Sequence, residues 1–468
     1  MLSIVGKRAH HCDGVSRREF LAAGVIAGNG FTLADLLRAE AVAGIGSSQK
    51  AIILLHLDGG PPQMDLIDPK PSAPAELRGE FRPISTAVPG LQFSEMLPQL
   101  AARADKLIAI RSLIGAAGRH DAFQCQSGHK VEELQSLGGW PAMGCVLAKL
   151  LGTPVDVSPT FVDLMLGRPL VRDSARPGFL GPSYQAFRPD ISQLFARPLE
   201  EGMKKELAQR GAQHAVSMSL IDGIPAKRLE DRGRLLTHLD RVRRRVDQTG
   251  AMDAMDQFHQ QAANILTSGR LASALDLQRC HPRDLQRYTA PAGGVKRFTT
   301  AEDRFSMRKL LFARRLIEAG VRCVSVSFSD FDTHQDNYPR MRQMLPILDH
   351  GLSALLDDLQ ERGMLDDVSI VAWGEFGRTP KINKNGGRDH WPRVGMALLA
   401  GGGMRTGQVI GATDRMAGEA TSRPVRYQDV FTTLYHNLGI DAGRTTIEDP
   451  RGRPRYLAPE GRPIREVV

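Results

Sequence analysis

The chain has 468 residues, of which 42% are hydrophobic and 24% are charged. These proportions are typical of globular proteins and exclude a wholly disordered, collagen-like or coiled-coil chain. Every apolar stretch is interrupted well short of the roughly 20 residues that a membrane-spanning helix needs, which excludes a polytopic membrane protein. The formal net charge of +9 comes from basic residues spread along the chain, without a nucleic-acid-binding motif. We therefore expect a large globular protein with no nucleic-acid partner and at most a mild preference for anionic substrates.

The first 43 residues have the layout of a secretory signal. The sequence Ser16-Arg17-Arg18-Glu19-Phe20-Leu21 precedes a stretch of small and apolar residues, and Ala41-Val42-Ala43 offers a cleavage site. Paired arginines followed by Phe-Leu are typical of twin-arginine signals, which address folded proteins to an export machinery. The alternative is an ordinary amphipathic helix. We predict residues 1–43 as a twin-arginine signal peptide, and residues 44–468 as an exported, periplasmic or extracellular chain without a transmembrane span.

Four cysteines follow the predicted signal, and none belongs to a Cys-x-x-Cys pair. This spacing argues against a zinc ribbon or a thioredoxin-like site. An oxidising compartment would allow disulfides, but a core of this size does not need them. We predict buried free thiols at Cys125, Cys145, Cys280 and Cys323.

Short apolar runs bounded by turn residues predict buried strands. They lie at 51–57, 107–111, 160–166, 321–328, 368–373 and 396–400. Helical patterns occupy the segments between them, at about 300–320, 339–362 and 427–438. Strands that alternate with helices indicate an α/β fold with a central, mostly parallel sheet covered by helices on both faces.

The stretch 222–290 differs because it has helical spacing and no strand signal. It contains the basic run Arg241-Val242-Arg243-Arg244-Arg245-Val246. One interpretation is an anion-binding or nucleic-acid-binding patch. We favour the other, a helical insertion on the main fold with a solvated basic face.

Side chains that can bind metal ions stand beside several predicted strands. In an open parallel sheet, ligands bind where the strands end at their carboxyl side. Carboxylate and imidazole ligands together suit zinc, manganese or iron. Two ions about 4 Å apart would hold a phosphoryl-like group and activate a water molecule. The candidate metal ligands are Asp58, Asp332, His334, Glu375, Asp389 and His390.

Each candidate also has an ordinary structural interpretation. Glu375 could be an ion-pair partner of Arg378, and Asp65 or Asp68 could replace Asp58 as the oxygen ligand of the first loop. His56 lies inside a buried strand, and we assign it to the core. Only the conjunction of several such groups at successive strand ends favours a metal site.

Five longer motifs resemble one family of exported bacterial proteins, catalogued as domain of unknown function 1501. They are His56-Leu57-Asp58-Gly59-Gly60-Pro61, Asp68-Pro69-Lys70-Pro71, Phe331-Asp332-Thr333-His334, Trp373-Gly374-Glu375-Phe376-Gly377-Arg378-Thr379-Pro380 and Gly387-Arg388-Asp389-His390-Trp391-Pro392. The family is grouped with the alkaline-phosphatase and sulfatase superfamily. The resemblance implies a single alkaline-phosphatase-like α/β sandwich over residues 44–468. It also implies one or two divalent metal ions, with zinc or manganese favoured and calcium or magnesium possible.

The superfamily pattern carries over to some residues. Asp58 matches the acid after the first strand, and Asp332 and His334 match the middle ligands. Glu375 stands where an Asp-His pair is usual, and His390 stands in the place of the late histidine.

The nucleophile departs from the superfamily pattern. Between residues 111 and 120, Ser112 is the only hydroxyl. Cys125 lacks the Cys-x-Pro-x-Arg context of a sulfatase formylglycine. The resemblance therefore leaves the identity of the nucleophile open.

Three further side chains are candidates for binding and proton transfer. His120 could be a metal ligand, a general acid to the leaving group, or a loop residue without a catalytic role. A histidine near its ordinary pKa is suited to proton transfer at neutral pH. Arg378 and Lys70 could hold an anionic group, or could be structural ion-pair partners.

We therefore predict an exported metal-dependent hydrolase that acts on a phosphate- or sulfate-type ester, either a small anionic compound or a polysaccharide. His120, Arg378 and Ser112 are its predicted catalytic residues. Because the nucleophile is uncertain, the alternative is a non-catalytic scaffold that binds an envelope polysaccharide or a partner protein. A metal-dependent transferase or phosphomutase is a third possibility, which burst kinetics would distinguish.

Overall fold

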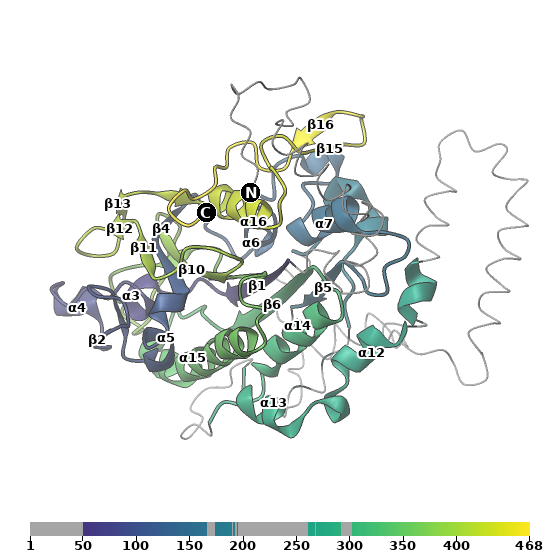
Figure 1. Ribbon diagram of the computed structural model, residues 1–468. Helices are drawn as coiled ribbons and strands as arrows, with labels where there is room; N and C mark the ends of the chain where they lie inside the picture. Colours follow the sequence, from purple (N-terminus) through teal and green to yellow (C-terminus); the bar gives the residue numbers. More distant parts are fainter. Residues whose placement is uncertain are drawn as a thin grey trace, which may run out of the picture. The chain divides into compact units, whose positions relative to one another are not determined.

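The computed structural model describes residues 50–165, 174–189, 191, 194, 261–266, 268–291 and 302–468. The predicted signal peptide at 1–43, and residues 222–260 of the predicted insertion, lie outside the described residues. In the described part, strands and helices alternate along the chain and form a layered α/β structure (Figure 1). No helix in these ranges is long and apolar enough to cross a membrane.

The central sheet has eight strands in the order β11-β4-β10-β7-β1-β6-β5, with β14 also paired to β4. Only β10 runs antiparallel to its neighbours in this described sheet, β4 and β7. The predicted mostly parallel sheet is therefore confirmed. The strands are β1 Ala51–Asp58, β4 Leu107–Ile114, β5 Phe161–Leu164, β6 Cys323–Ser329, β7 Val368–Trp373, β10 Gly395–Gly401, β11 Gln408–Ile410 and β14 Val425–Arg426.

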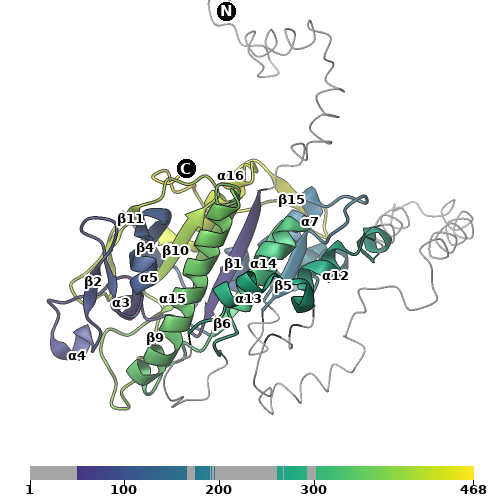
Figure 2. The ribbon, with the colours of Figure 1, turned by 60° about the horizontal axis from the view of Figure 1, so that its bottom comes forward.

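Helices cover both faces of the sheet, as Figures 1 and 2 show. Side chains alternate along a strand, so β1 sends Ile53 and Leu55 into one core and Ile52 and Leu54 into the other. The first core is covered by α12 Arg270–Leu275, α14 Arg308–Glu318 and α15 Asn337–Glu361, with α13 Pro282–Arg287 beside them. The second is covered by α6 Phe123–Ser127, α7 Met143–Leu151 and α16 Tyr427–Asn437.

The remaining described elements are short and lie outside the central sheet. The short helices are α3 Gln63–Leu66, α4 Ala75–Arg78 and α5 Pro98–Ala101, with 3₁₀ turns η1 Ala104–Lys106, η2 Gln135–Leu137, η3 Gly178–Leu180, η4 Pro182–Tyr184 and η7 Leu277–Arg279. Four two-stranded sheets pair β2 Pro83–Ser85 with β3 Gln92–Ser94, β8 Gly377–Arg378 with β9 His390–Trp391, β12 Ala412–Thr413 with β13 Ala420–Ser422, and β15 Thr446–Glu448 with β16 Pro454–Tyr456.

The register of the parallel strands brings three of their carboxyl ends to one edge. Asp58 of β1 is paired with Ser329 of β6, and His56 of β1 is paired with Trp373 of β7. The loops that follow β1, β6 and β7 therefore leave the sheet side by side. These are the loops that carry most of the predicted metal ligands.

One predicted helix start was wrong. The helix expected from Thr300 begins at Arg308. Glu302 lies within the expected helix but before the observed one. Its buried carboxylate binds Lys309 Nζ at 3.0 and 3.1 Å and accepts a hydrogen bond from the Ser329 amide at 2.9 Å. Burial of these two charges requires that they pair, which fixes the segment before α14 against the end of β6.

The prediction of buried free thiols is confirmed, whereas the insertion at 222–290 stays a prediction. The described part of 222–290 is helical, because α12 and α13 lie in it and α12 packs on α14. The thiols are free and buried at Cys125, Cys145, Cys280 and Cys323.

Candidate metal centre

Two groups of ligand-type side chains meet at the carboxyl ends of β1, β6 and β7. The first is a buried group of three: His56 and Asp58 from β1, and Glu375 from the loop after β7. One ligand atom from each lies within 4.8 Å of the others. His56 and Asp58 are two residues apart on a strand, so their side chains leave it in the same direction.

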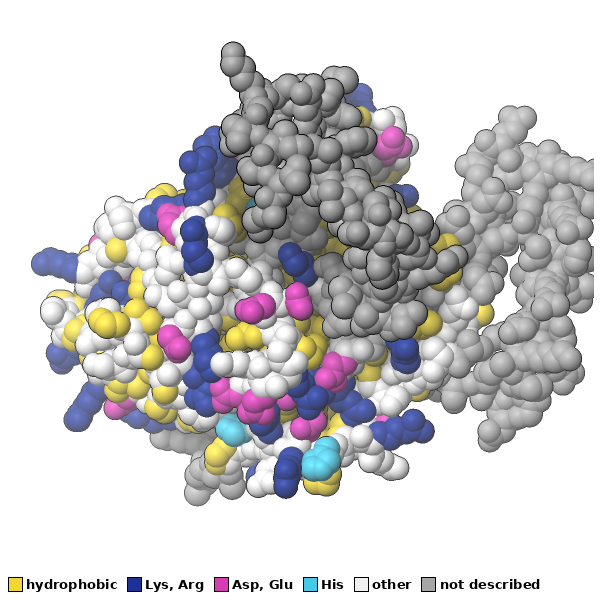
Figure 3. All heavy atoms as spheres, in the orientation of Figure 1, with side chains coloured by type: hydrophobic (Ala, Val, Ile, Leu, Met, Phe, Trp, Pro, Cys, Tyr) yellow, Lys and Arg dark blue, Asp and Glu magenta, His cyan; other side chains and the backbone are white. Residues whose placement is uncertain are grey.

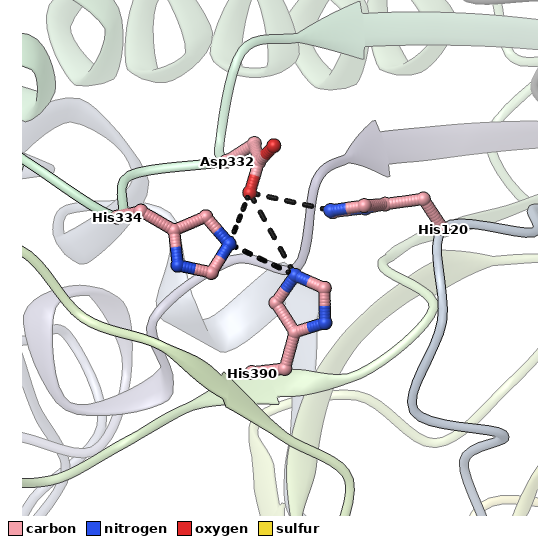
Figure 4. A group of neighbouring side chains, drawn as sticks. All are labelled: His120, Asp332, His334 and His390. Carbon is pink, nitrogen blue, oxygen red and sulfur yellow. Dashed lines mark hydrogen bonds and ion pairs between the residues drawn. The ribbon is translucent and has the colours of Figure 1, made fainter.

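The second is a more accessible group of four, in which three imidazoles surround one carboxylate (Figure 4). Asp332 Oδ1 lies 3.1 Å from His334 Nε2, 3.2 Å from His120 Nε2 and 3.8 Å from His390 Nε2. His334 Nε2 and His390 Nε2 face each other at 3.1 Å. The side chains come from the loop after β4 (His120), the loop after β6 (Asp332 and His334) and β9 (His390), so the chain's folding alone brings them together.

His120 joins the two groups. Its Nδ1 lies 3.0 Å from Glu375 Oε1 in the buried group, while its Nε2 contacts Asp332 in the accessible one. Burial by itself would lower the pKa of His120, but the hydrogen bonds to Asp332 and Glu375 outweigh it and raise this pKa to about 9. Without a bound cation, the His120 ring therefore carries the positive charge that the two carboxylates attract.

The pKa values of Asp332 and Glu375 are lowered, so both of these carboxylates are ionised. Burial would raise the pKa of Asp332, but hydrogen bonds from His120, His390 and Arg378 hold it far below its ordinary value. Burial also acts to raise the pKa of Glu375, and the hydrogen bond from His120 is the largest of the effects that more than offset it. The centre thus presents negative oxygens where a cation would bind.

The buried group leaves polar atoms without hydrogen-bond partners. In the described part of the chain, neither ring nitrogen of His56 makes a hydrogen bond, and neither does Glu375 Oε2, which lies 3.5 Å from His56 Nε2. Buried polar atoms are almost always paired in folded proteins. Burial lowers the pKa of His56, which keeps its imidazole neutral, the form that binds metals. A neutral imidazole beside the ionised Glu375, with no hydrogen bond at either ring nitrogen within the described residues, fits a divalent cation of the zinc and manganese class.

Arg378 does not face a substrate, which corrects the predicted anion-holding role. Its side chain is fully buried, and its guanidinium donates to the carbonyls of Gly59, Gly60 and Arg388 and to Asp332 Oδ1 at 2.8 Å. β8 and β9 pair Arg378 directly with His390. Arg378 therefore fixes the loop after β1 and orients Asp332, rather than offering donors to an anion.

Asp389 lies one step behind the accessible group. Its Oδ1 is 2.7 Å from His334 Nδ1 and accepts a hydrogen bond from Asn383 at 3.2 Å. A carboxylate in this position fixes the histidine tautomer so that Nε2 presents its lone pair to the centre, as the outer partners of metal-binding histidines do. The structure thus places Asp389 behind His334 and outside the group of four.

The structure also places the other residues that sequence reasoning considered. Ser112 is buried in β4 and donates to the Arg423 carbonyl at 2.6 Å, so its hydroxyl is not brought into either group. This position corrects the prediction that Ser112 is catalytic.

The alternative acids of the first loop have structural partners. Asp65 accepts two hydrogen bonds from the buried Arg388, at 2.8 and 2.9 Å. Asp68 pairs with Lys70 at 3.0 Å and with Arg111 at 3.4 Å. Asp58 therefore remains the acid of this loop that belongs to a ligand group, and Lys70 belongs to a structural ion pair.

His56 is the residue that sequence reasoning missed. It was assigned to the core because it lies within an apolar strand, and it is indeed fully buried. The available signal was its spacing, since a side chain two residues before Asp58 on the same strand points to the same face.

The fold and the site define an α/β protein with a candidate metal centre at the carboxyl edge of its sheet. The chain belongs to the family described as protein of unknown function DUF1501, which matches residues 49–468. The resemblance of its motifs to that family is thereby confirmed. No curated protein matches the chain.

Several solved structures are weakly similar. Ps i-CgsB, solved in complex with a neocarrahexaose, is 12% identical with a TM-score of 0.37, over 83% of this chain and 72% of its own. The PsFucS1 sulfatase from Pseudoalteromonas sp. is 13% identical with a TM-score of 0.33, over 86% and 70%. The phosphonate monoester hydrolase SpPMH from Silicibacter pomeroyi is 14% identical with a TM-score of 0.32, over 90% and 76%. Similarity this weak identifies neither a substrate nor a reaction for this chain.

Proposed function

We propose that the protein is an exported metal-dependent hydrolase of a phosphate- or sulfate-type ester, with residues 44–468 as one catalytic domain. The observation that carries the proposal is the meeting of two ligand groups at one sheet edge, joined through His120. Paired carboxylates and imidazoles at this spacing have few structural reasons to converge. In addition, the two ring nitrogens of His56 and Oε2 of Glu375 are buried and make no hydrogen bond within the described residues.

The two groups would hold one divalent ion each. His56, Asp58 and Glu375 would bind the first, and Asp332, His334 and His390 the second, with zinc or manganese favoured by the mixed nitrogen and oxygen donors. Bound ions would polarise the ester oxygen and make a water molecule nucleophilic at neutral pH.

The chain's own residues then have distinct tasks. His120 holds a proton between the groups and is partly accessible, so it is the residue that can deliver a proton to the leaving oxygen. Asp389 fixes the tautomer of His334, and Arg378 fixes the orientation of Asp332. Phe376 packs against the His390 ring with centroids 4.4 Å apart and limits its rotation.

The nucleophile is proposed to be water. Ser112 is engaged elsewhere, and Ser329, whose Oγ lies 3.4 Å from Asp58 Oδ2, is buried at the end of β6. A covalent intermediate on the enzyme would need an accessible hydroxyl beside the metals, so we expect steady turnover without a burst of product.

The test is an ester panel assayed on the mature chain. We expect hydrolysis of at least one nitrophenyl phosphate, sulfate or phosphonate, lost on chelation and restored by zinc or manganese. The His334→Ala variant should lose this activity, whereas His436→Ala, which removes another exposed histidine outside the centre, should keep it.

A second candidate function follows from the observed positions of Arg378 and Ser112. Arg378 and Ser112 both form hydrogen bonds to other residues of this chain. The centre could therefore belong to a non-catalytic scaffold that binds an envelope polysaccharide or a partner protein. Bound metal without turnover on any ester of the panel would favour this alternative.

A further inference from the structure

A second site of different chemistry lies on the helical face of the molecule. A pocket of about 920 Å³ opens between α5, α13, α15 and the segment that leads into α14. Figure 2 shows α13, α14 and α15 next to one another on this face. In Figure 3, basic and acidic side chains gather in the region of α13. None of the residues that line the pocket belongs to the candidate metal centre.

The lining is strongly basic. Five arginines and a single carboxylate line the pocket: Arg103, Arg283, Arg287, Arg304, Arg308 and Asp357. Two of the arginines are neutralised by acids. Arg103 forms a two-point ion pair with Asp357, and Arg287 bonds Glu361 at 2.6 Å and Asp358 at 3.1 Å.

The other three arginines have no ion pair with a carboxylate among the described residues. Arg304 and Arg308 both stack on the Phe305 ring, at 5.3 and 4.6 Å from its centroid. Two hydrogen bonds to Thr289 Oγ1, at 3.1 and 2.9 Å, hold the Arg308 guanidinium in place. Arg283 stands at the start of α13 and its side chain is exposed.

These two stacked guanidinium groups are close enough to repel each other. Burial is the largest effect that lowers the pKa of Arg308. The neighbouring positive charge of Arg304 lowers this pKa further, while the negative charge of Asp303 acts to raise it. The Arg308 guanidinium is half-buried and the Arg304 guanidinium is exposed, and an anion that contacts both would relieve the repulsion between them.

We propose that this pocket binds a saccharide that carries sulfate or phosphate groups, held by Arg283, Arg304 and Arg308. Arginine is suited to this task because its planar guanidinium donates to two oxygens of one oxyanion. The volume is that of a small-molecule site and far exceeds what one free anion fills. Apolar side chains such as Pro282 and Leu285 share the lining and can contact the CH faces of sugar rings.

Isothermal titration calorimetry on the mature chain tests the proposal. The probes are a sulfated oligosaccharide, its unsulfated counterpart, sodium sulfate and sodium phosphate. We expect the sulfated oligosaccharide to bind and its unsulfated counterpart not to bind. The Arg304→Gln/Arg308→Gln variant should weaken this binding by about tenfold or more.

Matched variants separate the pocket from general charge and from the metal centre. Arg444→Gln/Arg451→Gln removes the same net charge at exposed positions outside the pocket and should leave binding unchanged. Arg283→Gln, at an exposed position, should weaken binding without touching the Phe305 stack. The His334→Ala/His390→Ala variant should still bind the sulfated oligosaccharide. The pocket can therefore be tested even if the proposed hydrolase activity is not found.

Three results would overturn the proposal. They are no binding of the sulfated oligosaccharide to the natural chain, equal weakening in the Arg444→Gln/Arg451→Gln control, and binding of inorganic sulfate or phosphate without binding of the oligosaccharide. Weakened binding in both Arg283→Gln and Arg304→Gln/Arg308→Gln, each with an unchanged thermal unfolding midpoint, would support it.

Discussion

His120 is held at both ring nitrogens, by a buried carboxylate on one side and a partly accessible one on the other. If His120 delivers a proton rather than binding a metal ion, its substitution should lower the rate of the chemical step more than the metal content. We expect His120→Gln to lower kcat by about 10²–10⁴-fold while the metal content measured by mass spectrometry stays that of the natural chain. Loss of a metal ion in this variant would instead make His120 a ligand.

The structural role of Arg378 can be tested by substitution, because its guanidinium bonds only to groups inside the protein. Lysine keeps the charge but cannot reach the Gly59, Gly60 and Arg388 carbonyls and Asp332 together. We expect Arg378→Lys to lower the free energy of unfolding in urea by about 3–5 kcal/mol.

The matched control for that variant is Arg342→Lys, since Arg342 is exposed and pairs with the exposed Glu80. Such surface pairs contribute at most about 1 kcal/mol. An Arg378→Lys variant with unchanged stability and a raised KM would mean that Arg378 binds substrate after all.

At the residue scale, the sequence predicted which side chains stand at the strand ends, but it could not resolve what each one contacts. Asp58, Asp332, His334, Glu375 and His390 all belong to the two groups. Spacing along the chain does not reveal competition for partners. The Asp65 carboxylate accepts a hydrogen bond from Arg388, and the Arg378 guanidinium donates to a carbonyl of the loop after β1. These bonds occupy the groups that a metal ion or a substrate would otherwise contact.

At the scale of elements, α15 carries a carboxylate whose burial is not fully compensated. Asp349 is 1% exposed and accepts hydrogen bonds from the Gln99 and Leu100 amides at the start of α5. Burial raises the pKa of Asp349 from 3.8 to about 6, although those two hydrogen bonds act to lower it. A folded-state pKa above the unfolded one means that ionisation opposes folding.

The resulting pH dependence has a definite sign. The contribution of Asp349 to stability is greatest below pH 4, falls as the pH rises to about 6, and is constant above, a total loss of about 3 kcal/mol. The Asp349→Asn variant lacks this titration. Urea unfolding at pH 4.5 and 7.5 should therefore show the variant gaining stability relative to the natural chain at the higher pH, and parallel profiles would contradict the account.

Elements were predictable where one pattern dominates. A continuous apolar run such as 368–373 identifies a buried strand, and β7 occupies that range. Direction is not encoded in such a run, so the antiparallel orientation of β10 could not be predicted. The start of α14 was misplaced because the helical pattern does not reveal that Glu302 forms a buried ion pair with Lys309 outside the helix.

At the scale of the whole molecule, the parallel arrangement of β1, β6 and β7 explains why distant segments share one site. Their register brings residues 56–58, 330–334 and 375 to one edge, and β9 adds His390 from the next loop. The sequence could indicate this edge, because ligand-type residues follow successive strands. It could not indicate the basic pocket. The arginines of that pocket lie just after α5, in α13, just before α14 and at the first residue of α14, and they meet only after the helices pack.

The measurement that tests the account most directly is the number of metal ions bound per chain, determined by inductively coupled plasma mass spectrometry after reconstitution with zinc or manganese. The account predicts about two ions in the mature chain and in the His436→Ala control, and about one in His334→Ala/His390→Ala, which leaves the buried group intact. No bound metal in the natural chain, or the same content in that double variant, would contradict it.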